Sequence, residues 1–229
     1  MPARTLLAII AAFMTAACAR TIANLSPAPG ASVAEGAGKG AVATVDGVRV
    51  TARAEAWRWD PSDLKSKVTP MLLELRNDGQ IPIQVRYKGI SLTDSQGHRF
   101  NVMPPYDINA TVTEAEEIEN PLYGFSRFAI APYLSRWYPR MLRYDGRFLY
   151  DGSYYSPYLT RYHEIHLPTA DMVQRALPEG VLSPGGTAAG FVYFEALDRD
   201  AGTVTLSFDV VDAQTDTAVG TARVPFVAR

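Results

Sequence analysis

The chain has 229 residues, with 22 basic and 24 acidic side chains, a formal net charge of −2 and 47% hydrophobic residues. This balance, without a long basic or acidic block, gives no reason to expect a nucleic-acid-binding protein. Charges and prolines interrupt the apolar runs after residue 18, so no transmembrane helix is expected there.

The first 17 residues have the layout of an export signal. A cationic Arg4 is followed by an apolar stretch from Leu6 to Met14 and then by small residues up to Cys18, which is the only cysteine. The apolar stretch is too short to span a bilayer, which takes about 20 residues. We therefore predict a signal peptide over residues 1–17.

The tetrapeptide Thr15-Ala16-Ala17-Cys18 resembles the lipobox of bacterial lipoproteins, in which two small residues precede the cysteine that is lipidated, although Thr15 departs from the usual Leu. The resemblance implies a multiply acylated Cys18, which would hold the protein stably on a membrane of the bacterial cell envelope. Ala19, where an Asp would signal inner-membrane retention, favours the outer membrane, facing the periplasm. The alternative is ordinary signal peptidase cleavage after Ala19, which would remove Cys18 and release a soluble secreted protein.

Residues 18–40 are rich in Ala, Gly, Pro and Ser, as in Ser26–Gly30 and Gly36–Gly40. Such a segment has too little apolar bulk to fold alone. We predict a flexible tether that holds the domain on the order of 25 Å from the lipid surface.

Residues 41–229 are dominated by short segments of alternating apolar residues, separated by turn residues such as Asp46-Gly47 and Asn77-Asp78-Gly79. About 190 residues are enough for one domain. The predicted strands are residues 42–50 on both sides of the Asp46-Gly47 turn, 71–75, 81–85, 90–92, 100–102, 190–194, 204–210 and 218–227. Seven or eight such strands favour an all-β, two-sheet sandwich, because each strand has an apolar face that a second sheet must cover.

Two short helices are expected. Thr111 and Glu114 have the spacing of a capping box, which predicts a short acidic helix that ends before Pro121. A second helix is predicted over Ala170–Leu177, with Thr169 as its N-terminal cap.

Two parts of the chain carry distinct turn and strand motifs. They are Asn77-Asp78-Gly79, Pro82-Ile83, Val85, Ser91-Leu92, Asp94 and Gly97 in the first part, and Leu177–Leu182, Pro184-Gly185-Gly186 and Gly190–Phe194 in the second. In these motifs the chain resembles uncharacterised proteobacterial lipoproteins with an immunoglobulin-like β-sandwich domain. The resemblance, which covers about half of the mature chain, implies that fold and a lipid anchor. It implies no activity and no catalytic residues.

Residues 104–167 form an insertion in which the alternation breaks down. Eight of the twelve tyrosines lie between Tyr133 and Tyr162, together with several arginines. Tyrosine and arginine are enriched at interfaces, so we predict a binding surface here. Its candidate residues are Tyr133, Arg136, Trp137, Tyr138, Arg140, Arg143, Tyr144, Tyr150, Tyr154, Tyr155 and Tyr158.

Three roles remain open for this insertion. It either binds an envelope protein or glycan, or forms a satellite core that covers a sheet edge, or contacts the lipid surface. The upstream carboxylates Glu114, Glu116, Glu117 and Glu119 are possible partners of its arginines.

His163-Glu164-Ile165-His166 is the one compact group of possible metal ligands. In a strand the two histidines point to opposite faces, and a zinc site needs further ligands, so we expect neither a metal nor another cofactor. The expected function is a non-enzymatic binding or structural module anchored to a membrane, with no catalytic residues. The alternative is an envelope hydrolase whose site is assembled from scattered residues around His163 and His166.

Overall fold

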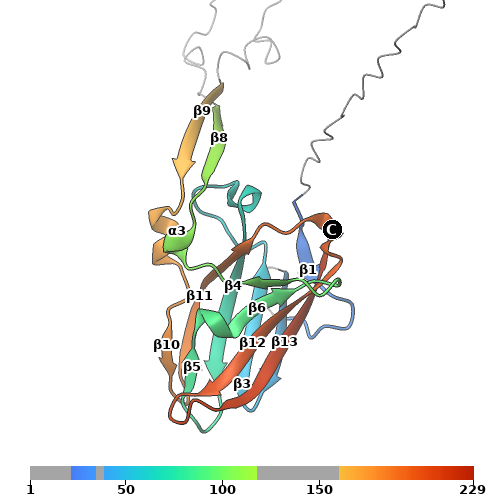
Figure 1. Ribbon diagram of the computed structural model, residues 1–229, viewed down its shortest axis with the longest axis vertical. Coiled ribbons are helices and arrows are strands. Elements are labelled where there is room, and N and C mark those ends of the chain that lie inside the picture. Colours follow the sequence, from blue (N-terminus) through green and yellow to red (C-terminus); the bar gives the residue numbers. More distant parts are fainter. Residues whose placement is uncertain (1–21, 35–38, 118–159) are drawn as a thin grey trace, which may run out of the picture.

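The computed structural model describes residues 22–34, 39–117 and 160–229. In these residues, the alternating segments of the sequence form two β-sheets that pack face to face (Figure 1). The chain is therefore an all-β sandwich, as the sequence predicts.

The four-stranded sheet is antiparallel throughout, with strand order β11-β4-β3-β2. Its strands are β11 (Thr187–Glu195), β4 (Val68–Asn77), β3 (Val48–Ala54) and β2 (Lys39–Val45). The β2–β3 hairpin closes at Asp46 and Gly47, whose φ angles are 47° and 78°. These left-handed conformations suit Asp and Gly and confirm the predicted turn.

The seven-stranded sheet is built on the long hairpin of β12 and β13. Strand β12 pairs on its other side with β6 along residues 205–208 and with β5 along residues 211–212. The members of this sheet are β1 (Leu25–Pro27), β13 (Ala218–Ala228), β12 (Thr203–Asp212), β5 (Ile83–Val85), β10 (Gly180–Leu182), β6 (Ile90–Thr93) and β7 (Arg99–Asn101).

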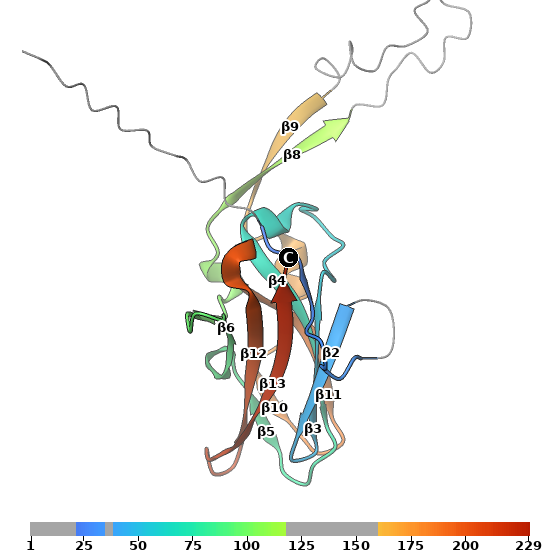
Figure 2. The ribbon, with the colours of Figure 1, turned by 90° about the vertical axis from the view of Figure 1, so that its right-hand side faces the viewer.

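The main core lies between the two sheets, which Figure 2 shows edge-on. Along β12 the buried side chains alternate with more exposed ones, as expected for a strand with one face on the core. The largest fully buried side chains here include Phe208, Phe226, Phe194, Leu73 and Ile90.

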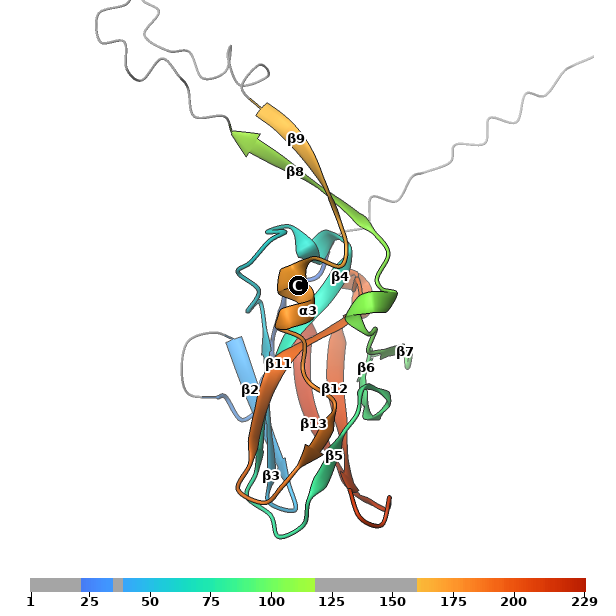
Figure 3. The same ribbon diagram turned by 90° about the vertical axis from the view of Figure 1, so that its left-hand side faces the viewer.

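A third sheet consists only of β8 (Thr111–Glu117) and β9 (Thr160–His166), which pair antiparallel along their full length. We call this pair the ribbon. It projects away from the two packed sheets (Figure 3). The predicted insertion therefore leaves and re-enters the domain through two paired strands.

Asn77 fixes the point where the chain crosses from one sheet to the other, and its side chain is completely buried. Its Nδ2 donates to the carbonyl oxygens of Ile81 (2.8 Å) and Leu182 (3.0 Å), and its Oδ1 accepts from the Gly79 amide (3.0 Å). The predicted reversal after Asn77 thus exists, but the strand that follows it, β5, joins the other sheet.

The Pro184-Gly185 turn that precedes β11 is also confirmed. Gly185 has a φ of 77°, and the Gly186 amide donates to the Ser183 carbonyl oxygen at 2.9 Å. Both features are those of a type II turn.

Of the two predicted helices, one forms. Helix α3 (Ala170–Gln174) begins after Thr169, whose Oγ1 accepts from the Met172 amide at 3.3 Å, as predicted for a cap. The prediction of a helix from Thr111 was wrong, because these residues form β8, whose backbone pairs with β9. The other helices within the described ranges are single 3₁₀ turns: η1 (Leu64–Ser66), η2 (Tyr87–Gly89), η3 (Pro105–Asp107) and η5 (Arg199–Ala201).

The predicted tether over residues 18–40 needs correction. Strand β1 pairs with the end of β13, and Leu25 is 1% exposed in the main core. Val33 forms a bridge with Ala41 on β2. Residues 22–34 therefore belong to the folded domain, because Ala23 and Leu25 are buried in the main core and β1 pairs with β13, which lies far along the chain.

Gly190 offers a test of the packing of β11. A Cβ atom at this position would lie 2.4 Å from the Leu177 Cα. Because backbone atoms cannot move aside cheaply, Gly190→Ala should destabilise the domain by about 2 kcal/mol in urea unfolding. Gly89→Ala is the matched control, since its Cβ would meet its neighbours at 3.6 Å. Equal stability of the two variants would contradict this account of β11.

Candidate functional site

One end of the sandwich carries the ribbon, the C-terminus and the first described residues (Figure 1). We call it the ribbon end. The loop of residues 55–67, between β3 and β4, contacts both the N-terminal segment and the ribbon. This loop therefore connects the two features that the sequence singled out, the chain start and the insertion.

The N-terminal segment is fixed to this end by backbone hydrogen bonds. The Ala23 amide donates to the Leu197 carbonyl oxygen at 3.0 Å. Asn24 and Arg229 exchange two bonds, at 2.9 and 3.0 Å, so the two ends of the described chain are paired. The first described residues are thus held at the ribbon end.

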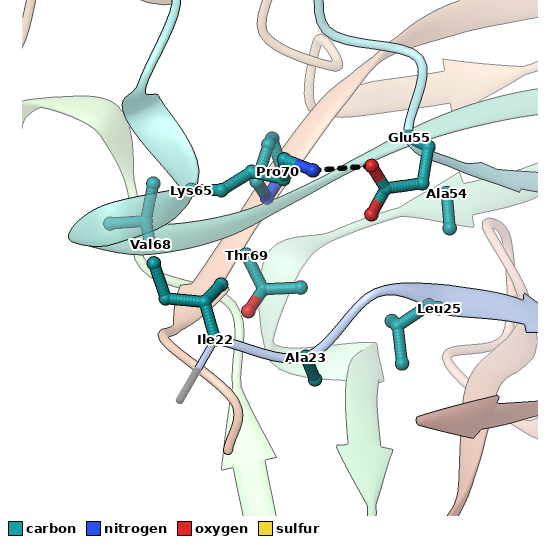
Figure 4. Close-up of a pocket in the computed structure, with 9 residues that line it drawn as sticks. All are labelled: Ile22, Ala23, Leu25, Ala54, Glu55, Lys65, Val68, Thr69 and Pro70. Carbon is teal, nitrogen blue, oxygen red and sulfur yellow. Dashed lines mark hydrogen bonds and ion pairs between the residues drawn. The ribbon is translucent and has the colours of Figure 1, made fainter. Parts of the chain in front are cut away.

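Lys65 ties the same segment to the loop. Its Nζ lies 2.5 Å from Glu55 Oε2 and 3.1 Å from Asn24 Oδ1. Glu55 has a φ of 57°, an uncommon conformation for a residue with a side chain, and it turns the carboxylate toward Lys65. Figure 4 shows the pair above a cavity of about 10 Å³, which is roughly the size of one water molecule.

A second core supports the ribbon on the outer face of β11 and β4. Trp57 is its centre, with edge-on ring contacts to Phe191 at 5.1 Å, Trp59 at 5.5 Å and Tyr193 at 6.2 Å between centroids. The Arg175 guanidinium lies 3.8 Å from the centroid of the Trp59 ring, in a cation–π contact. The buried members of this core are Trp57, Leu64, Val68, Ile108, Val112, Leu167, Met172, Phe191 and Tyr193.

The polar groups of Trp57 and Tyr193 in the second core are both hydrogen-bonded. Trp57 Nε1 donates to the Pro61 carbonyl oxygen at 2.9 Å, and the Tyr193 hydroxyl donates to the Met172 carbonyl oxygen at 2.9 Å. Burial raises the pKa of the Tyr193 hydroxyl well above its ordinary value, so this group stays a neutral donor. The core thus joins the loop, α3 and the base of the ribbon into one unit.

The ribbon meets this core through Val112, which is fully buried, while Tyr162 is 72% exposed further along. Beyond Val112, Glu114 Oε1 accepts hydrogen bonds from Ser62 Oγ (2.8 Å) and from the Asp63 amide (3.0 Å). Burial works against the charged carboxylate, but these bonds outweigh it, so the pKa of Glu114 is lowered. The ribbon is therefore held at its base by apolar packing and by one carboxylate.

The two histidines lie on opposite faces of β9, as their spacing predicts for a strand. His163 stands opposite Glu114 and His166 opposite Thr111. Both are exposed, and the His166 Nδ1 lies 3.1 Å from Thr111 Oγ1. Within the described ranges, no three His, Cys, Asp or Glu side chains are close enough to hold a metal ion. A hydrolase built around these histidines stays a prediction.

The predicted binding surface and the predicted lipidation site, Cys18, lie outside the described residues. This applies to Tyr133, Arg136, Trp137, Tyr138, Arg140, Arg143, Tyr144, Tyr150, Tyr154, Tyr155 and Tyr158. The satellite core that the rings of the insertion would form therefore stays a prediction. The second core is a different feature, since its described members come largely from outside the insertion and it covers a sheet face.

The sequence analysis did not find the residues that join the ribbon end. Glu55, Lys65 and Asn24 are ordinary polar residues in the sequence, and nothing local marks them as partners. The pair Trp57 and Trp59 was a usable signal, because two large rings two residues apart, directly after a strand, indicate a buried aromatic cluster.

Comparison of the chain with protein-family models, with curated proteins and with solved structures found no match. A search of the described part of the chain found no helix long and apolar enough to cross a membrane.

Glu114 makes attachment of the ribbon depend on pH. Its pKa is lowered in the folded protein, so its bonds to Ser62 and Asp63 are complete above its ordinary value of 4.5 and are lost as the pH falls through the lower, folded value. We expect the side-chain carboxyl carbon of Glu114 to titrate with a midpoint below 4.5 in an NMR pH series. In Glu114→Gln this titration should disappear. A midpoint at or above the ordinary value would contradict the conclusion that these hydrogen bonds lower the pKa of Glu114.

Lys65 should hold the N-terminal segment in place. Lys65→Met removes the contacts to Glu55 and Asn24, and because the pair is partly exposed it is worth at most about 1 kcal/mol. The amides of Ala23 and Asn24 should therefore exchange about fivefold faster in hydrogen-exchange measurements. Lys67→Met, at an exposed lysine two residues further on, should leave them unchanged. Equal effects of both variants would rule out a specific role of the Lys65 contacts in holding the N-terminal segment.

Proposed function

We propose that this protein is a lipoprotein of the bacterial cell envelope, anchored through Cys18, that acts as a non-enzymatic binding or structural module. The export signal and the lipobox-like residues at its start support the anchor. The apolar chains of an acylated cysteine would supply the membrane affinity, at about 0.8 kcal/mol for each buried methylene.

The main structural observation behind the proposal is the packing of the N-terminal segment. Because Ile22 already forms a bridge with Asp198, only residues 19–21 separate Cys18 from the folded domain. Fully extended, the chain from residue 18 to residue 22 spans about 14 Å. An acylated Cys18 would therefore keep the ribbon end close to the lipid, much closer than a tether of twenty residues would.

This orientation has a consequence for the insertion. Residues 118–159 connect the outer ends of β8 and β9, and the ribbon projects from the end that the anchor would hold at the membrane (Figure 1). Tyrosine, tryptophan and arginine are the residues that suit a membrane interface or a protein partner at that surface. We therefore propose that the Tyr/Arg-rich insertion acts at or near the membrane that carries the anchor.

The anchor is tested by the intact mass of the mature protein from membranes of its host. We expect a chain that begins at Cys18 and carries acyl mass, whereas Cys18→Ser should be recovered without acyl mass and away from the membrane. An unacylated chain beginning at Arg20 would refute the anchor and make the protein a soluble secreted one.

The orientation is tested separately with a fluorescent label on one introduced cysteine. Cys18 is the only native cysteine, so the acylated protein has no other thiol. A label on Tyr162→Cys, on the ribbon, should be quenched by lipid-borne quenchers in vesicles. A label on Gln214→Cys, in the β12–β13 turn at the opposite end, should not. Equal quenching of the two would refute the orientation and leave the anchor intact.

A further inference from the structure

The outer face of the four-stranded sheet is divided into two halves. The half toward the ribbon end is covered by the second core, which buries Phe191 on β11. The other half is open. It carries two adjoining hollows of about 340 and 450 Å³, and both are lined by Arg49, Thr51 and Glu74.

Strand register places four polar residues in one row across this open half. Thr44 on β2 stands opposite Arg49 on β3, Arg49 stands opposite Arg76 on β4, and Arg76 stands opposite Thr187 on β11. With strands about 4.8 Å apart, the row extends for about 14 Å. We call these residues, Thr44, Arg49, Arg76 and Thr187, the arginine row.

The centre of the row is an unfavourable pair for the protein alone. Two like charges directly opposite each other in a sheet destabilise it. Arg76 has a counter-charge in Asp78, whose Oδ1 lies 2.6 Å from Arg76 Nε. Arg49 is exposed and has no ion pair among the described residues. An oxyanion placed between the two guanidiniums would relieve this repulsion and receive two forked donors.

The surroundings of the row show what should carry the oxyanion. The hollows are open and cross several strands, so they suit an extended molecule and enclose no small ion. Thr44 and Thr187 place a hydroxyl on each side of the arginines. Glu74 pairs through Oε1 with Arg53 Nε at 3.2 Å, and because its side chain is 43% exposed it can also accept hydrogen bonds from hydroxyl groups. Carboxylates together with many hydroxyls are the functional groups of an acidic glycan.

We infer that the arginine row is a binding site for a linear, carboxylate-bearing glycan, with Arg49 and Arg76 gripping a carboxylate and the threonines bonding the neighbouring sugar hydroxyls. The site lies on the half of the sheet away from the ribbon end, and it does not depend on Cys18. It would give the protein a second contact, directed away from the proposed membrane contact.

The test is calorimetric titration of the full chain, in low salt, with a short oligogalacturonate. We expect binding that weakens as salt is added. Arg49→Gln and Arg76→Gln should each lower the affinity at least tenfold. Arg49→Gln should also keep or raise the melting temperature, since it removes the like-charge contact. Arg223→Gln, at an exposed arginine on the other sheet, is the charge-matched control and should bind like the wild type.

Several outcomes would overturn the inference. One is absence of oligogalacturonate binding by the wild type, and another is an equal loss of affinity in Arg223→Gln, which would indicate net charge alone. Equal binding of a neutral glucan would show that the arginines are not used. Equal binding of polyglutamate would indicate a surface for acidic peptides. Full displacement by inorganic phosphate at matched anion concentration would indicate that free oxyanions suffice.

Discussion

Burial of β11 on both of its faces is the constraint on which the rest of this structure depends. From Gly190 to Phe194 every residue is buried, although in a two-sheet sandwich only alternate side chains face the core between the sheets. Val192 and Phe194 face that core. Phe191 and Tyr193 face outward and need a cover of their own, which the second core around Trp57 provides.

This cover determines how the remaining elements are placed. The loop after β3, helix α3 and the base of the ribbon all contribute side chains to it, so they collect at one end of the sandwich. The same loop reaches the N-terminal segment through Lys65. Because the outward aromatic side chains of β11 need a cover, the chain start and the insertion come to lie at the same end of the sandwich. A lipid anchor and a membrane-proximal contact would act together there.

The cover is also incomplete, and the open half of the sheet has a different character. Beyond the second core the outward residues of β3 and β4 are polar and charged, and Arg49 faces Arg76 across the strands. Elsewhere on this face opposite charges pair, as Arg53 does with Glu74 at 3.2 Å, whereas Arg49 and Arg76 are like charges, which destabilise a sheet unless an anion lies between them. The two halves therefore separate a structural role near the ribbon end from a binding role away from it.

Local chemistry in the sequence was sufficient to locate most strands, the Asp46-Gly47 and Pro184-Gly185 turns and the Thr169 cap, because each depends on residues close together in the chain. Local chemistry was insufficient where the structure of a segment depends on residues far away in the chain. Thr111–Glu117 carries a helix-capping pattern but forms a strand, since β9 supplies its hydrogen bonds from more than forty residues away. Residues 22–34 look like a tether in composition but pack against β13 and β2. Likewise, the Arg49–Arg76 pair and the Lys65 contacts arise only from register and chain crossing. The alternation of apolar residues thus determined that this chain is a β-sandwich, whereas only the tertiary structure decided which polar groups meet, because pairing across strands is set by the packing of the whole chain.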